Sequence, residues 1–127
     1  MNLELKSILL DDIPKNLLIA GQEAGLLFTE STEMKLLLLD GVPVGYCGIC
    51  YKPRVMLKCE YVLPEHRRKG LLKYMIIQRL AEIKFKRGKR TAEANCTPLS
   101  LSVHIGCGAV EHKVFKNGIT QVVYENL

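Results

Sequence analysis

The stretch that decides the fold is Tyr61-Val62-Leu63-Pro64-Glu65-His66-Arg67-Arg68-Lys69-Gly70-Leu71-Leu72. An extended run leads into it and a segment with helical spacing follows, which predicts a strand, a proline-containing bend, a basic loop and a helix. The first N–H groups of a helix have no intrahelical partner and the helix dipole is positive there, so this entry is suited to an anion. The alternative is a solvated basic turn, because charge runs usually face water.

The segment after this loop carries the strongest helix signal in the chain. Between residues 70 and 87 the apolar side chains recur at i, i+3, i+4, i+8 and i+11, the spacing of one helical face. The residues on that face are Leu72, Met75, Ile76, Leu80 and Ile83. We therefore expect a helix from Gly70 to Arg87 with this face buried.

Upstream of the loop the pattern predicts a strand, a helix and three strands. The strand covers 3–9, and the helix opens at Pro14 behind the carboxylates of Asp11 and Asp12, which we expect to cap it, and stops at Gly25. Asp40-Gly41 is a hairpin signal. The strands that we expect around it and after a turn at 52–54 cover 35–39, 44–51 and 55–62.

Downstream we expect a strand over 90–94, a helix over about 98–107, and strands over 109–113 and 120–124 that flank Asn117-Gly118. The order β-α-β-β-β-α-β-α-β-β predicts an α/β (α+β) fold with a mixed central sheet of about six to seven strands and helices on both faces. No repeat, low-complexity tract or linker interrupts the sequence, so we expect a single domain over 1–127.

Composition narrows the classes of function. No segment approaches the ~20 apolar residues that span a bilayer, and no secretory signal is evident, so we expect a cytoplasmic protein without a membrane partner. Eighteen basic and thirteen acidic residues give a net charge of +5, which suits a polyanion, either nucleic acid or the phosphates of a cofactor. The five cysteines are an odd number, which favours reduced thiols.

Two other constellations suggest different functions. Cys47-Gly48-Ile49-Cys50 is a C-x-x-C pattern, which occurs in redox and zinc sites. Residues three apart on a strand point to opposite faces, and the other ligand candidates are scattered, so we expect buried thiols and no metal site. Those other candidates are Cys59, His66, His104 and Cys107.

A basic cluster at the end of the main helix suggests nucleic-acid binding. The cluster consists of Lys84, Lys86, Arg87, Lys89 and Arg90. Positive side chains also complement a helix C-terminus, and the chain has no Trp and 6% aromatic residues, so base reading is unsupported. A basic nucleic-acid-binding module stays an alternative.

The central stretch resembles the signature of the GNAT N-acetyltransferase superfamily, with matches at Val62, Pro64, Glu65, Arg67 and Gly70. Asn95, Leu99, Ser102 and Gly108-Ala109 parallel a downstream segment of that family, so the resemblance covers about 44–127. It implies a GNAT fold that binds acetyl-CoA. The implied cofactor-binding residues are Tyr61, Val62, Arg67, Arg68, Lys69, Gly70, Leu71, Leu72 and Asn95.

The sequence departs from the family at several places. Leu72 replaces a small residue of the loop, and Ala109 replaces a phenylalanine. The second helix of the family, near 28–34, is expected to shorten to a turn.

The resemblance also implies acetyl transfer to an amine by direct attack. Glu60 is the first choice for the general base, followed by Glu93 and then His104, and His104 occupies the place of a tyrosine that protonates the departing thiolate in the family. Main-chain N–H groups at Tyr61 or Val62 would stabilise the oxyanion. The alternatives are a surface Glu60 paired with Lys58 or Arg67, a structural His104 and a non-catalytic CoA-binding protein. The acceptor is undetermined, whether small molecule, peptide or protein, and an oligomer is possible.

Overall fold

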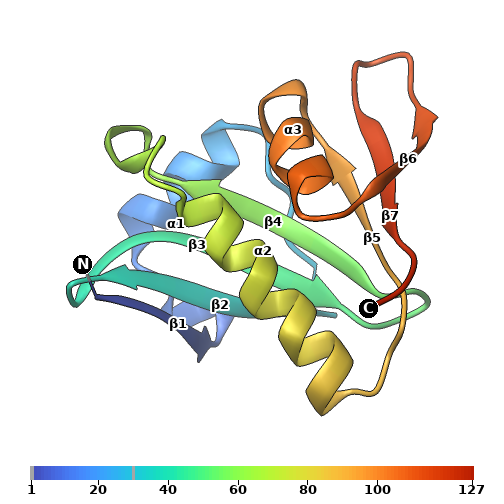
Figure 1. Cartoon of the computed structure of the whole chain (residues 1–127). Helices are drawn as coiled ribbons and strands as arrows, with labels where there is room; N and C mark the ends of the chain where they lie inside the picture. The colour runs from blue at the N-terminus through green and yellow to red at the C-terminus, as the bar shows by residue number, and fades with distance from the viewer. Residues whose placement is uncertain (1, 30) are drawn as a thin grey trace.

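The computed structural model describes residues 2–29 and 31–127, which form a seven-stranded sheet in the order β1-β2-β3-β4-β5-β7-β6 (Figure 1). Neighbouring strands are antiparallel except β4 and β5, which are parallel. This confirms the predicted mixed sheet. The strands are β1 Leu3–Ile8, β2 Thr32–Leu39, β3 Val42–Cys50, β4 Met56–Val62, β5 Ala92–Cys96, β6 Val110–Val114 and β7 Thr120–Tyr124.

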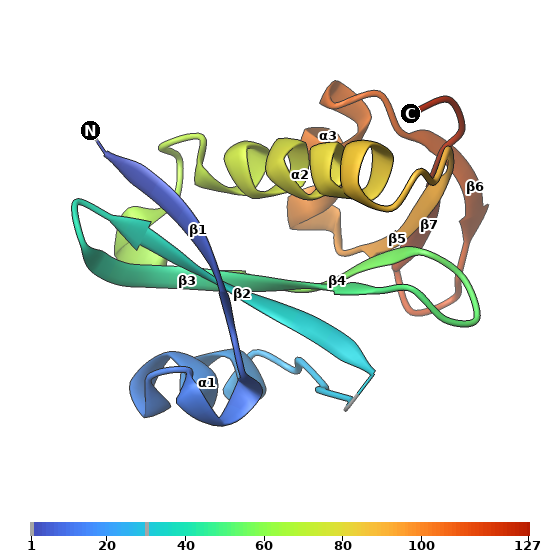
Figure 2. The same cartoon turned by 90° about the horizontal axis from the view of Figure 1, so that it is seen from below.

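Helices cover both faces of the sheet, as predicted. Helix α1 (Lys15–Glu23) packs on one face, and α2 (Leu71–Ala81) and α3 (Pro98–Gly106) lie on the other (Figure 2). Each face has its own apolar core: Leu17 of α1 packs with Tyr46 on one side, and Met75 and Ile76 of α2 are fully buried on the other. No helix among the described residues is long and apolar enough to cross a membrane.

Several predicted strand boundaries were wrong, among them those of β2 and β5. Strand β2 begins at Thr32 rather than residue 35, because its pairing with β3 extends to Cys50. Strand β5 begins two residues later than predicted, at Ala92, and continues to Cys96 opposite Thr120. Between α1 and β2, the described residues form no helix, in line with the expected turn.

The predicted capping of α1 was also wrong. Pro14 is the N-cap residue, and no side chain bonds to the cap. Asp11 and Asp12 instead belong to a short 3-10 turn, Leu10–Asp12, that precedes the helix. Pro14 fits this position because a proline has no N–H group and the first turn of a helix needs none.

The main helix ends in a π-helical turn, Glu82–Lys86, which sequence periodicity did not predict. The N–H of Arg87 bonds to the carbonyl of Glu82 at 3.3 Å, one residue further than in an α-helix. Ile83 is fully buried in the core, and the Glu82 carboxylate accepts a 2.7 Å bond from Lys35 on β2. The wider turn thus presents two successive side chains to the sheet.

Candidate active site

Strand β4 contains a bulge that separates it from β5. Cys59 has a φ of 57°, in the left-handed region, and Tyr46 pairs with Tyr61 while Gly48 pairs with Lys58. Cys47 therefore faces two residues of β4, Cys59 and Glu60, in place of one. The extra residue reverses the alternation of side chains along the strand, so Glu60 reaches α2 and α3.

Beyond the bulge β4 has a free edge. Among the described residues β4 pairs with β5 at two places, Met56 with Glu93 and Leu57 with Ala94. The rest of β4, through Val62, is paired with β3 on its other side. Apart from the carbonyl of Val62, which accepts a bond from Arg67, the N–H and C=O groups of this edge are thus available to an extended ligand, as in strand addition.

The free edge leads into the predicted anion site at the start of α2. Gly70 is the N-cap residue with a φ of 77°, no side chain caps the helix, and a Cβ built on Gly70 has no atom within 4 Å. Leu71 is buried and anchors the first turn. The N–H groups at 71–73 precede the first bond of the helix, which Tyr74 donates to Gly70. These N–H groups therefore have no partner within the helix, and they follow directly on the exposed basic residues of the loop.

The three basic residues of the loop have different surroundings. The Nε of Arg67 donates a 2.9 Å bond to the carbonyl of Val62, and its guanidinium lies 5.5 Å from the centre of the Tyr61 ring. Arg67 thus holds the loop against the end of β4. Arg68 and Lys69 are exposed and supply the positive charge of the loop.

The two predicted catalytic residues lie together. The Nε2 of His104 on α3 is 3.0 Å from the carboxylate of Glu60 on β4. The other ring nitrogen of His104, Nδ1, is 2.6 Å from the hydroxyl of Tyr124 on β7. His104 is 1% exposed and the Glu60 side chain 14% exposed, so this is a buried pair with one partly accessible member.

A buried arginine that sequence reasoning missed completes this cluster. Arg79 on α2 is fully buried, and its Nη2 donates a 2.6 Å bond to Glu60. The ion-pair partner of Glu60 is therefore Arg79, and not Lys58 or Arg67, the partners considered from the sequence. A signal was present, because Arg79 is four residues from both Met75 and Ile83 and so falls on the apolar face.

The charges of the cluster set the protonation of Glu60. Burial alone raises the pKa of this carboxyl, but the Arg79 charge and the bonds from His104 and Arg79 outweigh burial and lower the pKa to about 2. Burial also raises the pKa of Tyr124, so its hydroxyl stays protonated. Glu60 is therefore a carboxylate at neutral pH, and a weak proton acceptor.

The remaining predicted site residues lie on both sides of the split between β4 and β5. Tyr61 and Val62 are buried at the end of β4, while Leu72 is partly buried on α2. Asn95 is exposed on β5 and pairs with Gln121 of β7. Glu93, the second choice for a base, accepts a 2.7 Å bond from Gln121 and lies 3.2 Å from Arg54, beside the paired part of the two strands.

The C-x-x-C cysteines point to opposite faces of β3. Cys47 packs with Leu37 and Met75 on the α2 face. Cys50 lies on the other face, and its Sγ donates to the carbonyl of Lys52 at 3.1 Å. All five thiols are free, and the described residues contain no group of three or more His, Cys, Asp or Glu side chains placed to hold a metal ion.

The basic cluster at the end of α2 is partly neutralised. Arg87 bonds to both carboxylate oxygens of Glu33 at 2.9–3.0 Å and lies over the ring of Tyr51 at 4.1 Å. Arg90 donates to the carbonyl of Leu127 at 3.0 Å. These contacts give the two arginines structural roles.

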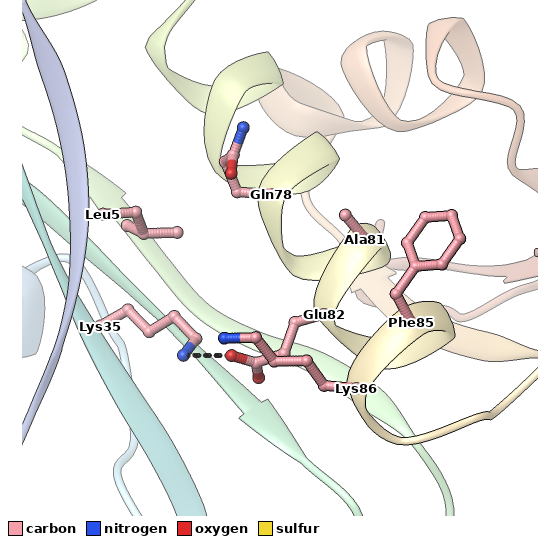
Figure 3. A pocket seen from close by; sticks show the side chains of 7 residues that line it. All are labelled: Leu5, Lys35, Gln78, Ala81, Glu82, Phe85 and Lys86. Atoms are coloured by element: carbon pink, nitrogen blue, oxygen red, sulfur yellow. Dashed lines mark hydrogen bonds and ion pairs between the residues drawn. The ribbon is translucent and has the colours of Figure 1, made fainter.

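A cavity of about 280 Å³ lies at this end of α2, away from the Gly70 loop (Figure 3). Two of its charged groups pair with each other, because Lys35 donates to Glu82, and Lys35 also donates to Ser7. It contains none of the predicted site residues. Its lining consists of Leu5, Lys35, Gln78, Ala81, Glu82, Phe85 and Lys86.

The fold is that of solved acetyltransferases. The chain superimposes on an IAA acetyltransferase from Bacillus cereus with a TM-score of 0.79 at 15% identity, over 99% of this chain and 100% of that one. A GNAT family acetyltransferase from Elizabethkingia anophelis with acetyl-CoA bound gives 0.77 at 12% identity, over 99% of both chains. The PaiA N-acetyltransferase from Thermoplasma acidophilum in complex with coenzyme A gives 0.78 at 12% identity, over the whole of both chains.

Comparison by sequence finds no matching family model and no matching curated protein. The structural likeness therefore establishes the fold, and the chain has the GNAT fold that the central stretch predicted.

Proposed function

We propose that this protein is an acetyl-CoA-dependent N-acetyltransferase. The observation that carries the proposal is one continuous surface, in which the free edge of β4 beyond Leu57 leads into the uncapped, basic start of α2 at Gly70. Such a surface suits a ligand with an extended amide-containing arm and a pyrophosphate, as acetyl-CoA has. Two proteins of the same fold hold acetyl-CoA or coenzyme A, which supports this assignment.

The proposed cofactor site uses both main chain and side chains. The N–H groups from Arg68 to Leu72 would bind the pyrophosphate, with the side chains of Arg68 and Lys69 adding charge. The N–H of Arg67, included in the range expected from the sequence, donates instead to the carbonyl of Pro64 at 3.3 Å. The edge of β4 around Tyr61 and Val62 would pair with the pantetheine arm, and Asn95 would contact it from β5. Acetyl-CoA supplies an activated acetyl thioester, and no metal is part of the proposal.

The proposed reaction is direct attack by a neutral primary amine on the thioester carbonyl. A C–N bond forms, the C–S bond breaks, the amine loses a proton and the leaving thiolate gains one. A main-chain N–H of Tyr61 or Val62 would stabilise the oxyanion. Glu60 and His104 remain the site residues of the proposal, but a carboxyl with a pKa near 2 and an imidazole with both nitrogens bonded are weakly suited to proton transfer.

The proposal is tested by calorimetric titration with acetyl-CoA. Saturable binding is expected, and Gly70→Glu should abolish it because a carboxylate would stand where the pyrophosphate is expected. Gly88→Glu is the matched control, because Gly88 also has a positive φ and open space where a Cβ would lie, but is located beyond the other end of α2. Release of free thiol in the presence of primary amines, peptide N-termini or lysine then identifies the acceptor class.

Two outcomes would contradict the proposal. Unchanged acetyl-CoA binding in Gly70→Glu would remove the loop from the site. Absence of acetyl-CoA binding, together with salt-dependent binding of a short DNA duplex, would identify a basic binding module instead.

A further inference from the structure

Beyond Leu57 the described residues of β4 and β5 form no strand pairs, so other contacts must fix the distance across this split between the two strands. On one side stand β4 and α2, and on the other β5, β7 and α3. Apolar contacts join the two sides near the paired residues, where Leu57 and Ile76 pack with Ala94 and Tyr124. Past Leu57, the described residues of β4 have no partner in β5.

A polar bridge crosses the split three residues further along β4. On the β4 side Glu60 is held by Arg79, whose guanidinium is itself fixed by main-chain carbonyls. The Nη1 of Arg79 donates to Gly48 of β3 at 3.0 Å, and its Nε donates to Met75 at 3.1 Å. Because the arginine is bound at three points, the position of the Glu60 carboxylate is set by β3 and α2 together.

The other side of the bridge is anchored in the same way. His104 on α3 meets Glu60 through Nε2 and Tyr124 through Nδ1, and Tyr124 also donates to the main-chain carbonyl of His104 at 3.4 Å. Tyr124 pairs with Ala92 in the β7–β5 ladder. Three short contacts in series, Arg79–Glu60, Glu60–His104 and His104–Tyr124, thus connect α2 and β4 to α3 and β7.

We propose that Arg79, Glu60, His104 and Tyr124 form a strut that fixes the separation between β4 and β5 beyond Leu57, where acetyl-CoA would bind. The inference rests on the proposed function. It makes Arg79 and Tyr124 positioning residues, which act through Glu60 and His104 rather than on substrate. The burial of His104 and the full use of both its ring nitrogens fit this role better than acid–base chemistry.

The test separates a positioning role from a catalytic one. Tyr124→Phe removes one hydroxyl, and His104→Gln removes the imidazole while leaving the Glu60–Arg79 pair. For both we expect the Kd and KM for acetyl-CoA to rise about tenfold, since each loses a buried bond, while kcat at saturating acetyl-CoA falls by a smaller factor. A large loss of kcat with unchanged Kd would overturn the strut and support acid–base catalysis by the pair.

Amide hydrogen exchange of the ligand-free protein provides a readout without activity. In Tyr124→Phe we expect faster exchange in the segment around Glu60 and in α3, because the two sides are no longer tied. Arg87→Gln is the control, since it breaks the exposed Glu33–Arg87 pair outside the split. Unchanged exchange in Tyr124→Phe would overturn the strut. If the wild type does not bind acetyl-CoA but exchange is faster in Tyr124→Phe, the proposed function is refuted and the strut is not.

Discussion

At the scale of single residues, Gly21 of α1 shows how closely the helix approaches the sheet. The hydroxyl of Tyr46 on β3 occupies the place where a Cβ on Gly21 would lie. Tyr46 is fully buried between the rings of Phe28 and Tyr61, at 5.7 Å from each, so it has little room to move. The glycine thus permits this contact between α1 and β3.

We expect Gly21→Ala to destabilise the protein by about 1–3 kcal/mol, because the added methyl overpacks this contact. Urea denaturation measures the change. Gly106→Ala is the matched control in another helix, where no atom lies within 4 Å, and it should leave the stability unchanged or raise it by up to about 1 kcal/mol. Equal effects of the two substitutions would contradict the packing argument.

Glu60 should make the stability depend on pH. Its pKa in the folded protein, about 2, lies below the ordinary value of 4.5, so the folded state favours the carboxylate. The stabilisation is complete above pH 4.5 and is lost as the pH falls from 4.5 toward 2. We expect the free energy of unfolding of the wild type to fall more steeply over this pH window than that of Glu60→Gln. Parallel slopes would show that folding does not lower the pKa of this carboxyl.

At the scale of elements, α2 joins the two functional features, because its first turn follows the loop and its last turn carries Arg79. We expect Arg79→Met to cost about 3–5 kcal/mol, since it leaves the buried Glu60 carboxylate without its charge partner. Arg87→Met, which breaks an exposed pair near the end of the same helix, should cost at most about 1 kcal/mol. Denaturation of both variants, and of Arg79→Met combined with Glu60→Gln, measures the coupling.

In that double variant part of the loss should be recovered, because no charge is then buried alone. A double variant no more stable than Arg79→Met would mean that the contacts of Arg79 with the carbonyls of Gly48 and Met75 dominate.

At the scale of the whole molecule, the net charge of +5 should guide an anionic cofactor to the loop. We expect the association rate of acetyl-CoA, measured by stopped flow, to fall several-fold as the ionic strength rises from about 0.01 M to about 1 M, because the screening length shrinks about tenfold. Pantetheine, which lacks the phosphates, is the control and should show little dependence. Equal salt effects on both ligands would contradict electrostatic steering.

The sequence predicted the element order and the Gly70 loop because both depend on local signals, namely periodicity, Gly, Pro and charge. It did not predict the bulge, since Cys59 has no intrinsic preference for a positive φ and adopts it through pairing with β3. Glu60 and His104 were selected from a family pattern, but their partner Arg79 was missed. The role of Arg79 depends on its partner Glu60, which lies on a strand 19 residues earlier in the chain, and local sequence signals do not show such a contact.

The two-residue pairing of β4 with β5 also divides the sheet into two ladders of hydrogen bonds. Strands β1 to β4 form a consecutive antiparallel set, and β5, β7 and β6 form a second one, so each half has its own ladder of hydrogen bonds. Fluctuations that open the junction can therefore leave both ladders intact. A ligand bound along the β4 edge and against β5 would contact both ladders at once and oppose such openings.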